Sequence, residues 1–358
     1  MSLETVKKAA AEFALDKAVN YVANNPEDNI LTMLDFAEKV ATRPDQKENI
    51  VKLKKHFIDN PVIFKQENRL CKNPKMLSKL MINWVANNEL AGKNLREKHA
   101  EQLGVSVPTL ILIDPTSACN LRCDGCWAGE YKKNDILEPE LLDRIFREAK
   151  ELGIYWIVFS GGEPFAYRPL LDLVEKHQDM VFMAYTNGTL IDEKIADRLA
   201  DLASFSPAFS LEGWREQTDA RRGNGTFDKV INAMDLLRER GVFFGASVTA
   251  TRENVDILFS ERFIDFLVEK GAVYEWCFHY IPIGRNPDPN LMLTAEQRAW
   301  LAHRVPQLRQ EKPIMIVDFW NDGEATKGCI AGGRSYFHIN AAGEVEPCAF
   351  SHFAADNI

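Results

Sequence analysis

Features that define several protein classes are missing from this sequence. None of its apolar runs reaches the roughly 18–20 residues that a membrane-spanning helix needs. The opening residues, MSLETVKKAA, contain no apolar core of a secretory signal, so we expect a cytoplasmic protein. Basic residues number 43 against 52 acidic ones, and the formal charge of −9 argues against a general nucleic-acid-binding protein.

The number of cysteines argues against a disulfide-stabilised secreted protein. The seven cysteines are an odd number, and no export signal precedes them, so a disulfide framework is a poor interpretation and metal or redox chemistry fits better. Hydrophobic residues make up 46% and charged residues 27% of the chain, as in globular proteins. Its 358 residues predict two domains, or one barrel-sized domain with additions.

Glycine is scarce in residues 1–106, which contain only Gly92 and Gly104. Apolar residues recur there at helical spacing, and one such stripe comprises Leu77, Leu80, Met81, Trp84 and Val85. We expect an N-terminal helical domain, packed as a bundle on the rest of the protein. The alternative is a docking surface for a partner or a peripheral contact with a membrane, in which residues 76–84 and flanking lysines lie on lipid.

From residue 107 onward, short apolar segments alternate with helical patterns. This alternation predicts a parallel sheet whose carboxyl ends meet on one face, where a barrel holds its ligands. We therefore expect an α/β fold: a partial (β/α)6 TIM-like barrel over 107–290, with the helical domain 1–106 and a C-terminal extension 291–358 that ends in a small β-hairpin. The predicted strands are 109–114, 154–160, 180–186, 207–211, 242–249 and 273–281.

Three cysteines crowd into the segment that follows the first strand. Cys119, Cys123 and Cys126 have the spacing Cys-x3-Cys-x2-Cys. Thiolates select zinc, Cu(I) or iron–sulfur clusters, and structural zinc needs a fourth ligand that no nearby Cys or His supplies. An iron–sulfur cluster held by three thiolates keeps one iron open for a ligand. Zinc with a distant fourth ligand and three unrelated thiols are the alternatives.

Further motifs follow the next strands in order. Gly161, Gly162, Glu163 and Pro164 come after the second strand, where the glycines let the backbone approach a ligand and the carboxylate suits an ammonium group. Together with the cysteine triplet, this segment resembles the radical S-adenosylmethionine (SAM) superfamily. The resemblance implies a [4Fe–4S] cluster on Cys119, Cys123 and Cys126, and contact between residues 161–164 and the methionine amino group of SAM.

The resemblance extends to later strand ends. It implies that Thr186 and Asn187 lie near the SAM ribose, that Ser210 and Glu212 touch the ribose or methionine part, and that Arg222 pairs with the SAM carboxylate. Arg221 is a competitor for that last role. One departure is that the family's aromatic residue before the third cysteine is replaced by Gly125, with Trp127 just after the motif.

Two C-terminal cysteines form a second, weaker pattern. Cys329, Gly343 and Cys348 resemble the start of the SPASM and twitch extensions, which hold auxiliary iron–sulfur clusters. Two thiolates cannot close a four-iron cluster. We expect a truncated extension; the alternatives are an auxiliary cluster on Cys329 and Cys348 that borrows a ligand such as Cys277, or no cluster.

As a function, the resemblance implies reductive cleavage of SAM to a 5′-deoxyadenosyl radical that takes hydrogen from a substrate, with an electron from a flavodoxin- or ferredoxin-like donor. We prefer peptide or protein modification; a lipid or isoprenoid substrate is one alternative, and a zinc-stabilised binding protein is another. No catalytic side chain is assigned. Aromatic residues expected to line the barrel and exclude water are Trp156, Phe159, Phe209 and Phe278.

Overall fold

The computed structural model describes residues 17, 21, 25–40, 44–59, 73–132 and 134–358. Parts of the expected N-terminal domain, and Cys71, lie outside these ranges. None of the helices in the described ranges is both long enough and apolar enough to cross a membrane.

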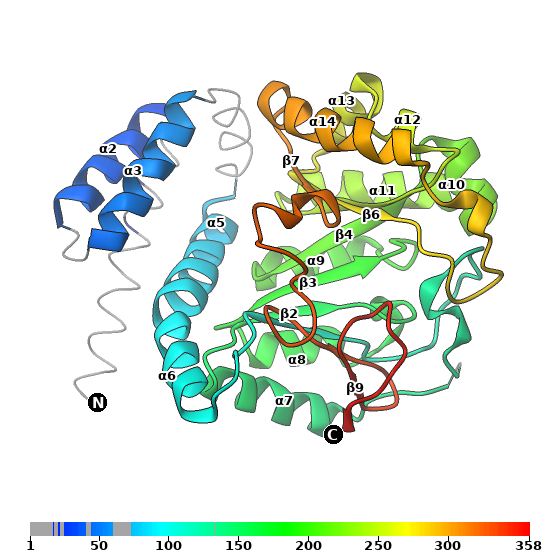
Figure 1. The fold of residues 1–358 in the computed structure, drawn as a ribbon, viewed down its shortest axis with the longest axis horizontal. Coiled ribbons are helices and arrows are strands. Elements are labelled where there is room, and N and C mark those ends of the chain that lie inside the picture. The colour runs from blue at the N-terminus through cyan, green and yellow to red at the C-terminus, as the bar shows by residue number, and fades with distance from the viewer. Residues whose placement is uncertain (1–16, 18–20, 22–24, 41–43, 60–72, 133) are drawn as a thin grey trace.

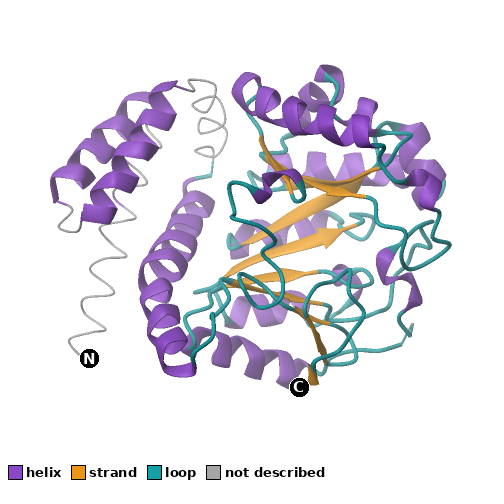
Figure 2. Cartoon of the chain, viewed as in Figure 1, coloured by secondary structure: helices purple, strands orange, loops and turns teal. Residues whose placement is uncertain are grey.

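In the described part of the chain, one sheet of ten strands forms the centre of the molecule (Figures 1 and 2). Its order is β10-β9-β8-β1-β2-β3-β4-β5-β6-β7. Pairing is parallel from β8 through β7 and antiparallel between β8, β9 and β10. The strands are β1 Leu110–Ile113, β2 Trp156–Phe159, β3 Val181–Thr186, β4 Phe205–Leu211, β5 Gly245–Ala250, β6 Tyr274–His279, β7 Met315–Asp318, β8 His338–Ile339, β9 Glu344–Glu346 and β10 Asp356–Asn357.

The six strands expected over residues 107–290 are present, and their bounds differ from the predicted ones by at most three residues. The C-terminal segment joins the same sheet at both edges, because β7 pairs with β6 and β8 pairs with β1. A small hairpin of β8 and β9 follows the expectation for this region.

Helices cover the outer face of the sheet, where the largest buried side chains are aromatic. Phe159 and Phe182 stack with ring centroids 5.9 Å apart, and Phe205 stacks on both. The helices that follow the strands are α7 Pro139–Glu151, α8 Leu170–Lys176, α9 Glu193–Leu202, α10 Arg215–Arg222, α11 Thr226–Glu239, α12 Val255–Leu258, α13 Glu261–Lys270 and α14 Ala295–Glu311, with short 3-10 turns η2 Trp127–Glu130, η3 Pro164–Ala166, η4 Pro289–Leu291 and η5 Asn321–Gly323.

The described N-terminal residues are mostly helical, as expected. The helices α2 and α3 pack on each other, and α5, η1 and α6 run on continuously beside the barrel (Figure 1). The middle part, η1, has π-helical hydrogen bonding. These helices are α2 Pro26–Val40, α3 Pro44–Asp59, α5 Pro74–Leu80, η1 Met81–Gly92 and α6 Lys93–Leu103.

The surface by which η1 packs on the barrel is polar, which differs from the predicted apolar stripe. Asn83, Asn87 and Asn88 are buried, whereas Trp84 is 37% exposed. The amide of Asn83 donates to the carbonyls of Gln178 and Met180, each at 2.8 Å. These carbonyls lie in the loop before β3, and buried backbone groups need partners. These positions of η1 therefore need amide side chains that can donate to the loop carbonyls. The hydrophobic pattern of the sequence does not reveal that need.

Part of the segment proposed as a membrane contact packs against the barrel instead. Met76 and Leu77 are buried, and both line a cavity shared with Phe243 and Val273. These two side chains are not available to a lipid surface in this structure.

Candidate functional site

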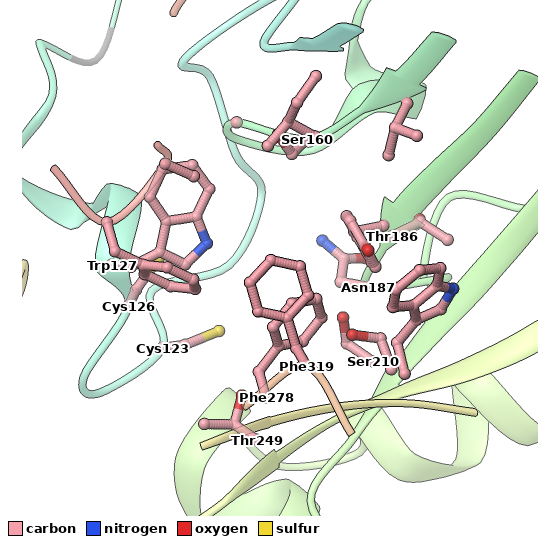
Figure 3. Close-up of a pocket in the computed structure, with 18 of the residues that line it drawn as sticks. Cys123, Cys126, Trp127, Ser160, Thr186, Asn187, Ser210, Thr249, Phe278 and Phe319 are labelled. Carbon is pink, nitrogen blue, oxygen red and sulfur yellow. The ribbon is translucent and has the colours of Figure 1, made fainter. Parts of the chain in front are cut away.

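The main pocket opens at the carboxyl ends of strands β1 to β6, and its cavity volume is about 210 Å³. Ten of the residues singled out from the sequence line it: Cys119, Cys123, Cys126, Gly161, Gly162, Glu163, Thr186, Asn187, Ser210 and Arg222. In Figure 3, Cys123, Cys126 and Trp127 lie on one side of the pocket, and Thr186, Asn187 and Ser210 lie on the other. Pro164, Glu212, Cys329 and Cys348 are not among the lining residues.

The cysteine loop between β1 and η2 is braced by two arginines. Arg221 donates to the carbonyls of Asp124 and Gly125, at 3.0 and 3.2 Å. Arg285 donates to the carbonyl of Cys123 at 3.2 Å. The backbone between the second and third cysteines is therefore held by two arginines, and the thiols of the loop line the pocket.

The spacing of the three thiols distinguishes a cluster from a single metal ion. Around one tetrahedral zinc, with Zn–S bonds of about 2.3 Å, sulfur atoms lie about 3.8 Å apart. Among the described residues, the sulfur atoms of Cys119, Cys123 and Cys126 do not form a group in which all ligand atoms lie within 4.8 Å of one another. A cluster spreads its thiolates over different irons. The arrangement therefore fits an iron–sulfur cluster better than the alternative of a zinc ion.

Burial disfavours the thiolate form of two of the three thiols. Desolvation raises the pKa of Cys119 to about 11, and it also raises the pKa of Cys123. Since thiolates are the ligands, cluster binding must release these protons.

The segment 161–163 packs tightly against the cysteine loop. A Cβ atom at Gly162 would lie 2.1 Å from the carbonyl oxygen of Ala118. Gly161 has a φ of +97°, which disfavours other residues. The two glycines are thus required for the close approach of two loops, which brings the backbone of this segment to the pocket.

The carboxylate of Glu163 is held in place by neighbouring protein groups. Its oxygens accept hydrogen bonds from the hydroxyl of Thr186 at 2.6 Å and from the backbone N–H of Asn187 at 2.7 Å. Burial raises the pKa of Glu163. The side chain therefore connects the loops after β2 and β3, and the backbone of 161–163 is the part left to face a ligand.

A cationic group forms the side of the pocket near the third cysteine. Arg221 and Arg222 both line the pocket, and both contact one oxygen of Glu212, at 2.7 and 2.5 Å. Burial opposes the charge of Arg222, but Glu212 and the nearby thiols raise its pKa. Two guanidinium groups against one carboxylate leave a net positive charge, which suits a ligand carboxylate. Glu212 positions the two arginines by forming an ion pair with each of them.

Only two of the four aromatic residues expected in the barrel line the pocket. Trp156 and Phe278 do, whereas Phe159 and Phe209 pack into the outer core against the helices. Side chains alternate along a strand, so Val158 on β2 and Ser210 on β4 face inward instead. The expectation was wrong for Phe159 and Phe209 because strands buried on both faces are apolar at every position.

A buried polar cluster beneath the pocket was missed from the sequence. His338 on β8 has its Nε2 3.0 Å from Asp114 Oδ2 and its Nδ1 2.7 Å from Glu346 Oε2. The hydroxyl of Tyr131 donates to Glu346 at 2.8 Å. Burial lowers the pKa of His338, but the two carboxylates outweigh this and raise it to about 9. No local spacing signals residues so far apart in the chain.

Trp127 joins the cysteine loop to the C-terminal segment. Its ring lies 5.7 Å from that of His338 and 6.1 Å from that of Phe350. The indole therefore contributes packing as well as lining the pocket. Within the described ranges, no compact ligand group includes Cys329 or Cys348: the first is exposed, and the second contacts the Tyr336 hydroxyl at 3.3 Å.

Comparisons with known proteins agree with this geometry. The family model of the radical SAM superfamily matches residues 113–256. Mycofactocin maturase MftC of Mycolicibacterium smegmatis is 30% identical over 278 residues, which are 71% of this chain and 68% of that protein. The chain belongs to the radical SAM superfamily. It is an enzyme, and its cofactors are a [4Fe–4S] cluster and S-adenosylmethionine.

Other relatives carry out different reactions according to their names. Fe-coproporphyrin III synthase of Methanosarcina barkeri is 28% identical over 63% of this chain and 59% of that protein. PqqA peptide cyclase of Granulibacter bethesdensis is 26% identical over 68% of each chain. This chain thus spans between 59% and 68% of the length of these relatives.

The fold is also that of solved relatives. The structure of SuiB from Streptococcus suis bound to precursor peptide SuiA has a TM-score of 0.58 and 19% identity, covering 73% of this chain and 65% of that one. This likeness supports the mostly parallel α/β barrel.

Proposed function

We propose that this radical SAM enzyme modifies a peptide or protein substrate. Together, the cluster and SAM supply a 5′-deoxyadenosyl radical that takes a hydrogen atom from the substrate. The single observation that carries the proposal is the composition of the main pocket, which combines three thiols, two arginines and several polar side chains with an aliphatic and aromatic surface. The relative named PqqA peptide cyclase supports a peptide as the substrate class.

Roles for the chain's own residues follow from the pocket. Cys119, Cys123 and Cys126 would hold the cluster. Arg222, assisted by Arg221, would bind the SAM carboxylate, and the backbone of residues 161–163 would accept hydrogen bonds from the amino group. Ser210, Thr186 and Asn187, which line the same pocket, would offer polar partners to the ribose. A flavodoxin- or ferredoxin-like protein would donate the electron.

The cluster assignment is tested by changing the three loop cysteines to alanine. After anaerobic reconstitution, the wild type should form 5′-deoxyadenosine under dithionite, and the triple variant should form none. The matched control replaces Cys329 and Cys348 with alanine and should retain iron at the main site and SAM cleavage. Continued 5′-deoxyadenosine production by the triple variant would refute the assignment.

The substrate class is tested by deuterium transfer. The reconstituted enzyme is incubated with SAM and either a perdeuterated peptide pool or a perdeuterated lipid extract, and 5′-deoxyadenosine is analysed by mass spectrometry. Deuterium from the peptide pool alone supports the proposal. Deuterium from the lipid extract alone would contradict it.

A lipid or isoprenoid substrate is the second candidate, and one feature of the pocket favours it. The interior is lined by aliphatic and aromatic side chains, which include Leu110, Leu112, Val158, Met183 and Trp276. An apolar chain would bury more surface there than a polar peptide segment would. The same deuterium experiment separates the two candidates.

A further inference from the structure

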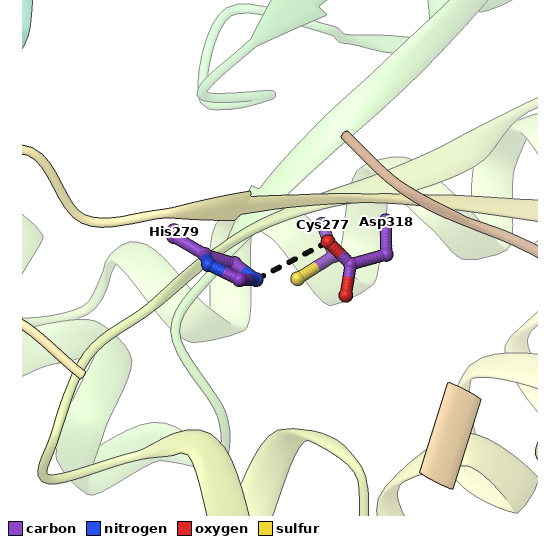
Figure 4. A group of neighbouring side chains, drawn as sticks. All are labelled: Cys277, His279 and Asp318. Carbon is purple, nitrogen blue, oxygen red and sulfur yellow. Dashed lines mark ion pairs between the residues drawn. The ribbon is translucent and has the colours of Figure 1, made fainter. Parts of the chain in front are cut away.

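A second group of potential metal ligands lies at the β6–β7 edge of the sheet, apart from the cysteine loop. Cys277 and His279 are two residues apart on β6, so their side chains project from the same face of the sheet. Asp318 ends β7 and pairs directly with Cys277 in the sheet register. Figure 4 shows the sulfur, the imidazole and the carboxylate turned toward one another.

The distances within this trio match a single small ion. The sulfur, a ring nitrogen and a carboxylate oxygen all lie within 4.8 Å of one another. His279 Nε2 is 3.2 Å from Asp318 Oδ1. Around a tetrahedral zinc, with Zn–N and Zn–O bonds near 2.1 Å, these two atoms would be about 3.4 Å apart. The trio is therefore spaced as the ligands of one ion, unlike the three cysteines of the loop.

The imidazole is buried, and one of its two ring nitrogens lacks a partner. His279 is 6% exposed; its Nε2 faces Asp318 Oδ1, and its Nδ1 makes no hydrogen bond with any described residue. The ring stacks on that of Trp320 with centroids 5.4 Å apart, which fixes its plane. Leaving a buried polar group without a partner costs about 1–3 kcal/mol. A ligand at the ring nitrogen removes that cost.

Asp318 is already oriented as a ligand by its surroundings. Its Oδ1 accepts hydrogen bonds from the backbone N–H groups of Trp320 and Asn321, at 3.2 and 3.1 Å, and its Oδ2 accepts one from the Asn321 side chain at 2.7 Å. Such outer contacts typically hold metal-binding carboxylates in place. The same turn carries Phe319, which lines the main pocket.

We propose that Cys277, His279 and Asp318 bind one zinc ion, with water or another donor in the fourth position. A set of one thiolate, one imidazole and one carboxylate suits zinc, whereas calcium and magnesium prefer oxygen ligands. Cys277 is fully buried, which excludes a role as a nucleophile toward a large substrate. His279 is also among the residues that line the main pocket. The ion fixes the β6 and β7 ends, and with them the turn that presents Phe319.

Cobalt spectroscopy tests the site in the full chain. The background is the variant in which Cys119, Cys123 and Cys126 are alanine, so that the loop cannot take up the probe. Titration with Co²⁺ should give one equivalent of a tetrahedral visible spectrum with a thiolate-to-cobalt charge-transfer band. Zn²⁺ should abolish the spectrum by displacing the cobalt. Absence of any tetrahedral cobalt spectrum would overturn the proposal.

Variants locate the ion within the chain. Adding Cys277→Ala should remove the charge-transfer band, and adding His279→Gln should weaken Co²⁺ binding at least tenfold. The matched control, which adds Cys329→Ala and Cys348→Ala, should leave the spectrum unchanged. If the band survives Cys277→Ala or disappears in the control, the ion lies elsewhere and the proposal is wrong.

A second measurement tests the site independently of the cobalt spectrum, in case a cysteine variant misfolds. Zn²⁺ should raise the thermal unfolding midpoint of the background protein by at least several degrees, because an ion that binds only the folded state stabilises it. Asp318→Asn keeps the shape of the side chain, and this stabilisation should be largely lost there. An equal zinc-dependent shift in the background protein and in its Asp318→Asn variant would contradict the assignment.

Discussion

Raising the pH should remove a stabilising charge from the buried cluster of His338, Asp114 and Glu346. The imidazole is fully buried, and its pKa rises from 6.5 in the unfolded chain to about 9 in the folded one. A group whose pKa rises on folding binds its proton more tightly in the folded state. Its contribution is therefore fully present below pH 6.5 and is lost as the pH rises through 9.

The magnitude follows from the difference between the two pKa values. One pKa unit corresponds to about 1.4 kcal/mol, so the charged imidazole contributes about 3 kcal/mol to the free energy of unfolding at pH 6. By the same linkage, the contribution falls to less than half of this value at pH 8 and nearly vanishes at pH 10.

Urea unfolding at a series of pH values measures this effect. Because other groups also titrate, the useful quantity is the difference in free energy of unfolding between the wild type and His338→Gln. That difference should shrink by about 3 kcal/mol between pH 6 and pH 10. His303→Gln, at an exposed histidine, should show no such dependence. A constant difference for His338→Gln across this range would refute the reasoning.

Three further substitutions test the packing around the site. Gly162→Ala places a Cβ 2.1 Å from a backbone oxygen of the cysteine loop, so the iron content after reconstitution should fall; Gly323→Ala has open space and should retain it. Asn88→Ala removes the acceptor of a backbone N–H just before β2 and should lower the free energy of unfolding by about 1–3 kcal/mol in urea; a change below about 0.5 kcal/mol would contradict the role of these amides. Phe159→Ala should cost about 3–5 kcal/mol in the same assay, because the ring fills the outer core and not the pocket; loss of SAM cleavage with unchanged stability would place it in the pocket.

Much of the barrel could be predicted from the sequence because its strands are short apolar runs separated by amphipathic helices. Polar residues follow the strand ends, and parallel strands bring those ends together. That rule was enough to gather Cys119, Glu163, Asn187 and Ser210 at one pocket.

Other features depended on partners that sequence patterns do not reveal. The inward face of β2 could not be chosen, because Trp156 through Phe159 are all apolar. The buried side of η1 is determined by backbone carbonyls in a loop distant in the sequence. Asn83 is buried because its amide donates to these carbonyls, whereas the neighbouring Trp84 stays partly exposed. The cluster at His338 needs Asp114, which is far away in the sequence although it follows the neighbouring strand β1.

The C-terminal segment is part of the reaction chamber. It adds β7 beside β6 and β8 beside β1, so it extends the barrel sheet at both edges. Side chains from this segment, Phe319, Tyr336 and Phe350, line the main pocket. The two strands by which it joins the barrel also carry buried polar groups that were not foreseen, at His338 and at Asp318. Both edges of the barrel therefore place a buried histidine–carboxylate contact on strands of the segment whose aromatic side chains line the pocket.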